Sequence, residues 1–357
     1  MPEPLRVAYT LEQCWHDVPG GTAFAALEVL ERLVRRADVE PVGVAGRHRR
    51  TPPAPFVPPV PVRSLPVGRP WLYETWNRFD WPAVERATGR VDVCHSTTAI
   101  PAASAAPKVV TVHDVAFVAA PKRFTRHGAR VMRAGLERCR AADLIMCPSA
   151  ATANGLRELG FPGDRLRIVP WGVEPATITE TDRDRVGRRF GLPDEFVLFV
   201  GTVEPRKNLP RLVEALAAST VDLPLVVAGA PGWGAEFPVH GVRAHFLGFV
   251  EAGDLPALFD LATVFAYPSL EEGFGLPVLE AMAYGTPVVT SKATATEEVA
   301  GEAAVLVEPA DVESIAAGLG AALDRADELR AAGLARAARF SWEATTDATV
   351  AAYREVA

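Results

Sequence analysis

The sequence has 357 residues, of which 49% are hydrophobic and 23% charged, and its formal net charge is −7. This composition is ordinary for a globular protein, and the length favours two α/β domains over a single core. No apolar run is long enough to span a bilayer, and the opening MPEPLRVAYT lacks the basic head and apolar stretch of a secretory signal. These features argue against a membrane-spanning or secreted protein, so we expect a cytoplasmic one.

The four cysteines also argue against a secreted protein. They form no CxxC pair and have no histidine at metal-ligand spacing, and they stand at Cys14, Cys94, Cys139 and Cys147. The pattern argues against a disulfide framework or a zinc site and favours a reducing cytosol.

Charge is divided unevenly along the chain. Residues 1–172 carry 23 Lys and Arg against 16 Asp and Glu, a net +7, whereas residues 173–357 carry 14 against 28, a net −14. A basic half suits an anionic membrane surface or a phosphorylated acceptor. A solvated, arginine-rich helix around residues 123–140 produces the same excess without any partner, and the sequence leaves both interpretations open.

Short β-branched runs alternate with amphipathic stretches along the chain. The first half predicts strands at 5–9, 39–44, 91–96, 108–113, 144–149 and 166–170, and helices at 22–36, 128–141 and 150–160. A polar, turn-rich stretch at 171–194 predicts a linker. The second half predicts strands at 196–201, 223–229, 244–249, 263–269, 286–291 and 303–309, and helices at 208–219, 254–262, 276–284 and 311–338.

This alternation predicts the α/β fold class, with two Rossmann-like domains that face each other across an interdomain cleft. Ligands of such sheets bind beyond the carboxyl ends of the strands, so the cleft is the expected site. Residues 51–70 hold eight prolines, which excludes a helix or a central strand there. We expect a semi-rigid surface loop, with a recruitment motif as the alternative.

The stretch SLEEGFGLPVLEAMAYGTPVVT (269–290) runs from a strand end through a Gly-rich turn into a helix. The free amides at that helix start, near Gly275 and Leu276, predict an anion site. Glu272 precedes the helix and Glu280 lies inside it, with seven residues between them. Two carboxylates in these places suit the hydroxyls of a ribose or a sugar. The alternative is a pair of solvated glutamates at a helix end.

A second cluster, FVGTVEPRKNL (199–209), follows another strand end at Gly201. Arg206 and Lys207 stand together beside a helix N-terminus, where the helix dipole makes cations costly unless an anion neutralises them. A diphosphate is one such anion, and the alternative is ion pairing with Glu204 or another acidic neighbour.

The first half contributes two weaker signals. Gly20 and Gly21 open a helix after the first strand, where backbone amides could approach a phosphate or a sugar. His113 follows the strand KVVTV, from which its imidazole could bond a sugar hydroxyl. A loop histidine satisfied by Asp114 explains that position equally well.

The order of these motifs resembles the retaining glycosyltransferases of family 4, which have the GT-B fold of two Rossmann-like domains. The similarity extends over nearly the whole chain, including VPWGV (169–173) and FSWEATTDATVAAYREV (340–356). It implies an acceptor-side domain at 1–171, a nucleotide-sugar-binding domain at 172–340 and a C-terminal helix at 341–357 that packs back on the first domain.

The resemblance also implies an activity: transfer of a hexose from a nucleoside-diphosphate sugar, GDP-mannose or a UDP-sugar, to a hydroxyl of a lipid-linked glycan, polysaccharide or natural product. Glu272 and His113 would be the catalytic residues that meet the transferred sugar, and Glu280 would bind the ribose. The other implied donor-binding residues are Gly20, Gly21, Gly201, Arg206, Lys207, Phe274, Gly275 and Leu276. No metal, other cofactor or nucleic-acid partner is expected, while peripheral contact with the inner face of a membrane stays open.

The sequence departs from the family pattern at two positions. Thr202 stands where many members have arginine, and Glu297 stands where proline is common. A DxD string at Asp182 and Asp184 falls in the expected linker, so we interpret it as incidental rather than as a metal-diphosphate motif. A nucleotide-sugar epimerase or hydrolysing enzyme on the same fold, and a non-catalytic sugar-nucleotide-binding protein, are the alternative functions.

Overall fold

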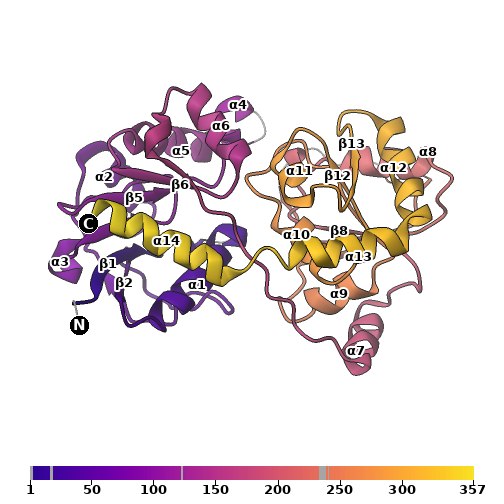
Figure 1. The fold of residues 1–357 in the computed structure, drawn as a ribbon, viewed down its shortest axis with the longest axis horizontal. Helices are drawn as coiled ribbons and strands as arrows, with labels where there is room; N and C mark the ends of the chain where they lie inside the picture. The colour runs from indigo at the N-terminus through magenta and orange to yellow at the C-terminus, as the bar shows by residue number, and fades with distance from the viewer. Residues whose placement is uncertain (1–2, 17–18, 122–123, 233–238, 240) are drawn as a thin grey trace. The chain divides into compact units, whose positions relative to one another are not determined.

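A computed structural model describes residues 3–16, 19–121, 124–232, 239 and 241–357. The chain divides into two compact units, which Figure 1 shows as ribbons. Unit 1 comprises residues 1–172 and 341–357, and unit 2 comprises residues 173–340. Each unit is an α/β assembly around its own parallel sheet, so the expected fold class is confirmed.

The described part of unit 1 contains a seven-stranded parallel sheet in the order β3-β2-β1-β4-β5-β6-β7. Its strands are β1 (Leu5–Thr10), β2 (Val39–Ala45), β3 (Val62–Ser64), β4 (Val93–Ser96), β5 (Lys108–Thr111), β6 (Leu144–Cys147) and β7 (Leu166–Ile168). Its helices are η1 (Glu12–Trp15), α1 (Gly20–Val34), α2 (Trp71–Phe79), α3 (Glu85–Thr88), α4 (Ala116–Ala119), α5 (Arg126–Cys139), α6 (Ala150–Glu158), η3 (Gly163–Arg165) and α14 (Trp342–Val356).

The described part of unit 2 contains a six-stranded parallel sheet in the order β10-β9-β8-β11-β12-β13. Its strands are β8 (Val197–Val200), β9 (Leu225–Ala228), β10 (Ala244–Gly248), β11 (Val264–Tyr267), β12 (Val288–Ser291) and β13 (Val305–Val307). Its helices are α7 (Glu180–Phe190), η4 (Pro205–Lys207), α8 (Leu209–Ala218), α9 (Leu255–Leu261), α10 (Leu276–Ala283), α11 (Ala295–Ala300), α12 (Val312–Asp324) and α13 (Ala326–Ala337).

The strand order reverses once in each sheet. In unit 1 the chain passes from β1 outward to β3 and then returns to β4 on the other side of β1, and in unit 2 it does the same between β8 and β11. At such a switch point the loops that leave two adjacent strands diverge and open a crevice at their carboxyl ends. Two segments far apart in the sequence, after β8 and after β11, are therefore brought to one edge of the unit 2 sheet.

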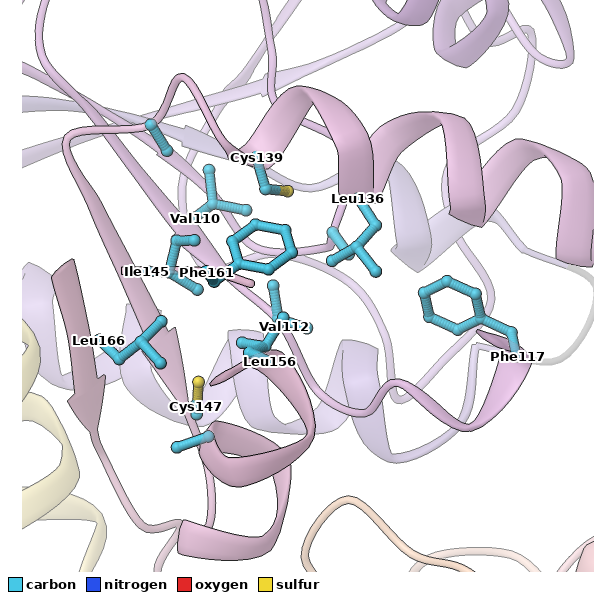
Figure 2. Close-up of a cluster of buried hydrophobic side chains, with 13 residues drawn as sticks. Val110, Val112, Phe117, Leu136, Cys139, Ile145, Cys147, Leu156, Phe161 and Leu166 are labelled. Carbon is cyan, nitrogen blue, oxygen red and sulfur yellow. The ribbon is translucent and has the colours of Figure 1, made fainter. Parts of the chain in front are cut away.

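The central strands are buried on both faces, as their uninterrupted apolar sequences require. In unit 1, the residues of β6 all lie in the interior, and Figure 2 shows Ile145 and Cys147 of this strand in the same apolar cluster as Leu136 and Cys139 of α5. All four cysteines are free and buried, and burial raises the pKa of the Cys147 thiol to about 12. These thiols therefore act as small apolar side chains.

Helix α14 belongs to unit 1, where it packs on α1 (Figure 1). Trp342 at its start is buried and meets Phe24 of α1 edge to face, with ring centroids 6.0 Å apart. Near its end, the Tyr353 hydroxyl lies 2.7 Å from Nδ1 of buried His95 in β4. The helix thus covers the sheet of unit 1 with both apolar and polar contacts.

Several elements differ from those expected from the sequence. The stretch 171–194 is not wholly irregular, because it contains α7, which begins at a capping box in which Thr179 and Asp182 bond each other's backbone amides. The Asp182–Asp184 string is therefore a helix start, in agreement with its interpretation as incidental. The Pro-rich segment contains the edge strand β3, and the helix expected at 311–338 is divided at Arg325 into α12 and α13.

Gly172 provides a test of how α14 joins unit 1. A Cβ atom on Gly172 would lie 2.2 Å from the backbone nitrogen of Trp342, whereas one on Gly187 in α7 would meet no atom of the described residues within 4 Å. We expect Gly172→Ala to lower the free energy of unfolding by about 1–3 kcal/mol, because backbone on both sides must move. Gly187→Ala should be neutral or stabilising by up to about 1 kcal/mol, because alanine favours a helix. Calorimetric melting of both variants checks this, and equal effects would contradict it.

Candidate functional site

The loops that leave β8 and β11 in unit 2 bring three predicted residues together. Oε2 of Glu272 accepts a hydrogen bond from Arg206 at 2.9 Å, and Oε1 accepts one from Lys207 at 2.8 Å. Oε1 also accepts from the hydroxyls of Ser269 at 2.7 Å and Tyr267 at 3.0 Å. The carboxylate is almost completely buried, with 8% of its side chain exposed. Glu272 is thus the centre of a buried network at the switch point of the sheet.

The surroundings of Glu272 keep it ionised. Burial alone would raise its pKa, but the charges of Arg206 and Lys207, with hydrogen bonds from Lys207 and Ser269, lower the pKa to about 2. Burial lowers the pKa of Lys207, and the charge of Glu272 opposes that shift. The Lys207 ammonium also lies 4.7 Å from the centroid of the Tyr267 ring and bonds its hydroxyl.

Arg206 has a second acidic partner, because it forms an ion pair with Glu204 at 2.8 Å. The sequence left two explanations for the adjacent cations, a diphosphate or acidic neighbours, and the structure contains the acidic neighbours. A diphosphate that entered this site would have to compete with Glu204 and Glu272 for Arg206 and Lys207.

Glu280 is in a different electrostatic state from Glu272. It lies inside α10 and is partly buried, and across the described parts of the chain no ion pair or hydrogen bond of its carboxyl group is found. Burial raises its pKa to about 8. The motif therefore combines one carboxylate that is always charged at neutral pH with one that is easily protonated.

The Gly-rich turn before α10 has a conformation that only glycine accommodates well. Gly275 has φ +98°, and a Cβ atom there would lie 2.6 Å from Cγ2 of Thr296. Phe274 beside it is buried against Phe340, with ring centroids 6.1 Å apart, and Leu276 begins the helix. The first amides of an α-helix have no partner within the helix, so this turn can present N–H groups to an anion.

Gly201 follows β8, and its amide donates to the carbonyl of Ala228 at 2.9 Å. A Cβ atom on Gly201 would lie 3.7 Å from Cε of Lys207. The amide of Gly201 is therefore already used within the sheet. If Gly201 contributes to a ligand site, it does so by leaving space beside Lys207.

In unit 1, Gly20 and Gly21 form the first residues of α1. Gly20 has φ +62°, and a Cβ atom on it would meet no atom of the described residues within 4 Å. A Cβ atom on Gly21 would lie 4.0 Å from the ring of Trp171.

His113 lies just beyond β5 with a defined orientation. Its Nε2 lies 2.8 Å from the carbonyl oxygen of Thr97, which can only accept, so Nε2 carries the proton and Nδ1 has a lone pair. Nδ1 is buried and has no partner among the described residues. Burial lowers the pKa of His113, and the Thr97 carbonyl and Asp114 oppose the shift. Asp114 does not satisfy the imidazole, since its carboxylate accepts from the amide of Ala116.

Four residues that the sequence did not single out take part in these arrangements. Tyr267 and Ser269 stand at the exit of β11, where their polar groups could have been noticed as strand-end residues. Trp171 lies within 5.4 Å of the His113 ring, measured between centroids. His95 bonds Tyr353 and Thr111, and burial lowers its pKa to about 3, so it is neutral. No sequence pattern distinguishes it from an ordinary strand residue.

Comparisons with known proteins identify the class. The family described as Glycosyltransferase Family 4 matches residues 19–177, and the family described as Glycosyl transferases group 1 matches residues 180–339. Together with the relatives below, these matches show that the chain belongs to glycosyltransferase family 4.

Several of the relatives are mannosyltransferases. O-antigen chain mannosyltransferase B of Escherichia coli is 34% identical over 69% of this chain and 70% of its own length. MMP alpha-(1->4)-mannosyltransferase of Mycolicibacterium hassiacum is 34% identical over 60% of this chain and 54% of its own length. The matches with several of the other relatives likewise span about half of those proteins or less.

Solved structures share the fold. Alr3699/HepE of Anabaena, in complex with UDP and glucose, matches with a TM-score of 0.73 and 17% identity, covering 98% of this chain and 100% of that one. The lipopolysaccharide-biosynthesis glycosyltransferase WaaG matches with a TM-score of 0.70 and 19% identity, covering 98% and 99%. The chain therefore has the GT-B fold, and the family matches and relatives above show that it is a glycosyltransferase. Within the residues that the structure describes, no helix is long and apolar enough to cross a membrane.

Replacing each of the two glutamates by glutamine should change the free energy of unfolding with opposite dependences on pH. Glu272 has its pKa lowered from 4.5 to about 2, so its contribution to stability is present above pH 4.5 and is lost as the pH falls toward 2. Glu280 has its pKa raised from 4.5 to about 8, so its contribution is present below pH 4.5 and is lost as the pH rises through 8.

We therefore expect Glu272→Gln to lower the free energy of unfolding at pH 7 by about 3 kcal/mol, because two buried cations lose their partner. Glu280→Gln should raise it by about 1–3 kcal/mol at pH 9 and change it little at pH 5. Calorimetric melting across this pH range checks both. Destabilisation by Glu280→Gln at pH 9 would show that its carboxyl group is paired or solvated.

Proposed function

We propose that the protein transfers a hexose from a nucleoside-diphosphate sugar to an acceptor hydroxyl with retention of anomeric configuration. The observation that carries this proposal is the glutamate pair at the switch point of unit 2, with Glu272 bound to two cations and Glu280 unpaired among the residues that the structure describes. Such a site offers cations for the diphosphate of a nucleotide sugar and carboxyl groups for the hydroxyls of its sugars.

The cations and the turn before α10 are suited to the leaving group. Arg206 and Lys207 lie at the exit of β8. The amides near Phe274, Gly275 and Leu276 lie at the start of α10, which follows β11, the neighbouring strand of the sheet. Positive groups of this kind stabilise the charge that develops on a departing diphosphate.

The carboxyl groups are suited to the sugar and the ribose. Glu272 remains ionised at neutral pH, so it can accept a sugar hydroxyl and stabilise positive charge near the anomeric carbon. Glu280 has no protein partner in the described residues, so it has unused capacity to accept the hydroxyls of a ribose.

Unit 1 would contribute His113 and the glycines of α1. The lone pair on Nδ1 of His113 can accept a hydroxyl of the transferred sugar, and its lowered pKa keeps the ring neutral for that purpose. The open backbone at Gly20 and Gly21 would allow a donor phosphate to approach α1 closely. Retention follows if the acceptor attacks on the face of the leaving group and a phosphate oxygen takes its proton.

The substrates are proposed by class. The names of several relatives describe mannosyl transfer, and one structural neighbour was solved with UDP and glucose, so GDP-mannose and UDP-sugars are the donors to try first. We propose a lipid-linked glycan, a polysaccharide or a natural product as acceptor. A lipid-linked acceptor would place the protein at the inner face of a membrane as a peripheral protein.

A panel of UDP-, GDP-, ADP- and dTDP-sugars tests the donor site by calorimetry. We expect one nucleotide class to bind, and Lys207→Ala to weaken that binding by about 1.5–3 kcal/mol through loss of a charge-assisted bond. Arg211→Ala is the matched control, because Arg211 lies one turn further on and bonds Asn208 at 2.7 Å. Equal binding by Lys207→Ala and wild type would refute the diphosphate role. Donor consumption without a glycosylated acceptor would support the hydrolase or epimerase alternative.

We also expect turnover to persist in excess EDTA. Arg206, Lys207 and the amides before α10 can meet the diphosphate charge, and the described residues include no group of three or more His, Cys, Asp or Glu placed to hold a metal ion. Initial rates measured with and without chelator check this. Loss of activity on chelation, restored by Mg²⁺ or Mn²⁺, would contradict metal independence.

A further inference from the structure

Helix α2 of unit 1 and the residues just after it present large aromatic side chains to solvent. Trp71 is 67% exposed, Phe79 is 71% exposed and Trp81 is 44% exposed. Trp71, Arg78 and Phe79 follow the i, i+7, i+8 spacing of one helical stripe, so the aromatic groups flank an exposed arginine on the same side of α2. Exposed aromatic side chains of this size along one helix face mark an interaction surface.

The outer face of α5 is basic. Arg126, Arg130 and Arg133 are exposed and follow the i, i+4, i+7 spacing, so they line one face of the helix. The opposite face of α5 is buried, and Figure 2 shows Leu136 and Cys139 directed into the apolar cluster. The arginines therefore point away from the core of unit 1.

The two helices form a continuous surface. The carboxylate of Glu74 in α2 pairs with Arg78 at 3.3 Å and also with Arg130 of α5. The amide of Asn77 donates to the carbonyl of Val131 at 3.1 Å. The aromatic stripe of α2 and the basic stripe of α5 are thereby held side by side, and we call this surface the α2–α5 face.

We propose that the α2–α5 face docks on an anionic lipid bilayer, with its arginines on lipid phosphates and with Trp71, Phe79 and Trp81 in the headgroup region. This inference rests on the proposed function, because it assigns the surface by which a peripheral enzyme would reach a lipid-linked acceptor. Aromatic rings with exposed edges suit the membrane–water interface, and arginine clusters suit anionic headgroups.

Charge complementarity distinguishes this occupant from a second copy of the chain. A two-fold dimer through the α2–α5 face would bring the arginines of both copies together, which is unfavourable. The whole chain has a net charge of −7, so overall charge would repel an anionic vesicle. Unit 1 carries 24 Lys and Arg against 19 Asp and Glu, so attraction to such a vesicle depends on a local basic surface.

Flotation of the full chain with vesicles tests the proposal without donor or acceptor. We expect binding to vesicles that contain phosphatidylglycerol, little binding to pure phosphatidylcholine, and weaker binding at high salt because salt screens the attraction. The double variant Arg126→Gln, Arg133→Gln should bind about 25-fold more weakly, at about fivefold for each arginine. Trp71→Ala with Phe79→Ala should also reduce binding.

A matched control uses exposed residues of the same types in unit 2. The variant Arg188→Gln, Arg243→Gln removes the same charge from side chains that are 82% and 63% exposed. Phe246→Ala with Phe249→Ala removes rings that are 52% and 66% exposed. Both controls should bind vesicles like wild type. Failure of the wild type to float at low salt, or equal losses in control and test variants, would overturn the proposal.

Two further measurements separate the remaining outcomes. Trp71→Phe, which keeps an aromatic ring in place, should reduce the quenching of tryptophan fluorescence by brominated lipid, and unchanged quenching would count against the α2–α5 face. Light scattering measures the mass in solution, and a dimer that is lost in Trp71→Ala, Phe79→Ala would reassign the face to self-association. Donor calorimetry on the same variants reports the proposed function separately, because the α2–α5 face contains none of the donor-site residues.

Discussion

The arrangement of the loops that leave β8 and β11 depends on one buried ion-pair network. Two loops leave adjacent parallel strands at the point where the strand order reverses, and in the absence of other contacts they would diverge. Glu272 joins them, because it comes from the exit of β11 and binds two cations from the exit of β8. Buried charges of this kind are costly to desolvate and strongly destabilising when one partner is lost. The network therefore fits the proposed role of these residues in holding fixed charges better than it fits a gain in stability.

The two glutamates of the motif show how one sequence pattern can hold two chemical groups with different properties. The difference arises from the strand and helix that carry them. Glu272 follows a strand whose neighbour supplies cations, whereas Glu280 lies inside a helix whose surroundings supply none among the described residues. A carboxyl group that is already paired with cations before a ligand arrives is suited to holding charge in place. A carboxyl group without such partners is suited to a ligand that brings its own hydrogen-bond donors.

Much of this could be predicted from the sequence, and the exceptions have physical reasons. Period-two and period-3.6 patterns located most strands and helices, and the glycine-containing motifs at strand ends marked the two loops that the structure brings to one edge of the unit 2 sheet. The ion pairing of Arg206 was left open because two neighbouring acids and an external anion satisfy a cation equally well in a one-dimensional pattern. Helix α7 was missed because its capping box was taken as polar linker. Tyr267 and His95 were missed because they bond residues distant in sequence, Lys207 and Tyr353 respectively.

The position of α14 has a consequence for how the chain acquires its structure. Gly172 packs against Ser341 and Trp342, and the amide of Val173 bonds the carbonyl of Phe340. Both ends of residues 173–340 therefore meet at one place, and unit 2 is an insertion in the sequence of unit 1. During synthesis, all residues of unit 2 are translated before unit 1 is complete, although translation of unit 1 begins first. The sheet of unit 1 must wait, partly uncovered, for a helix that emerges only after the whole inserted unit has been translated.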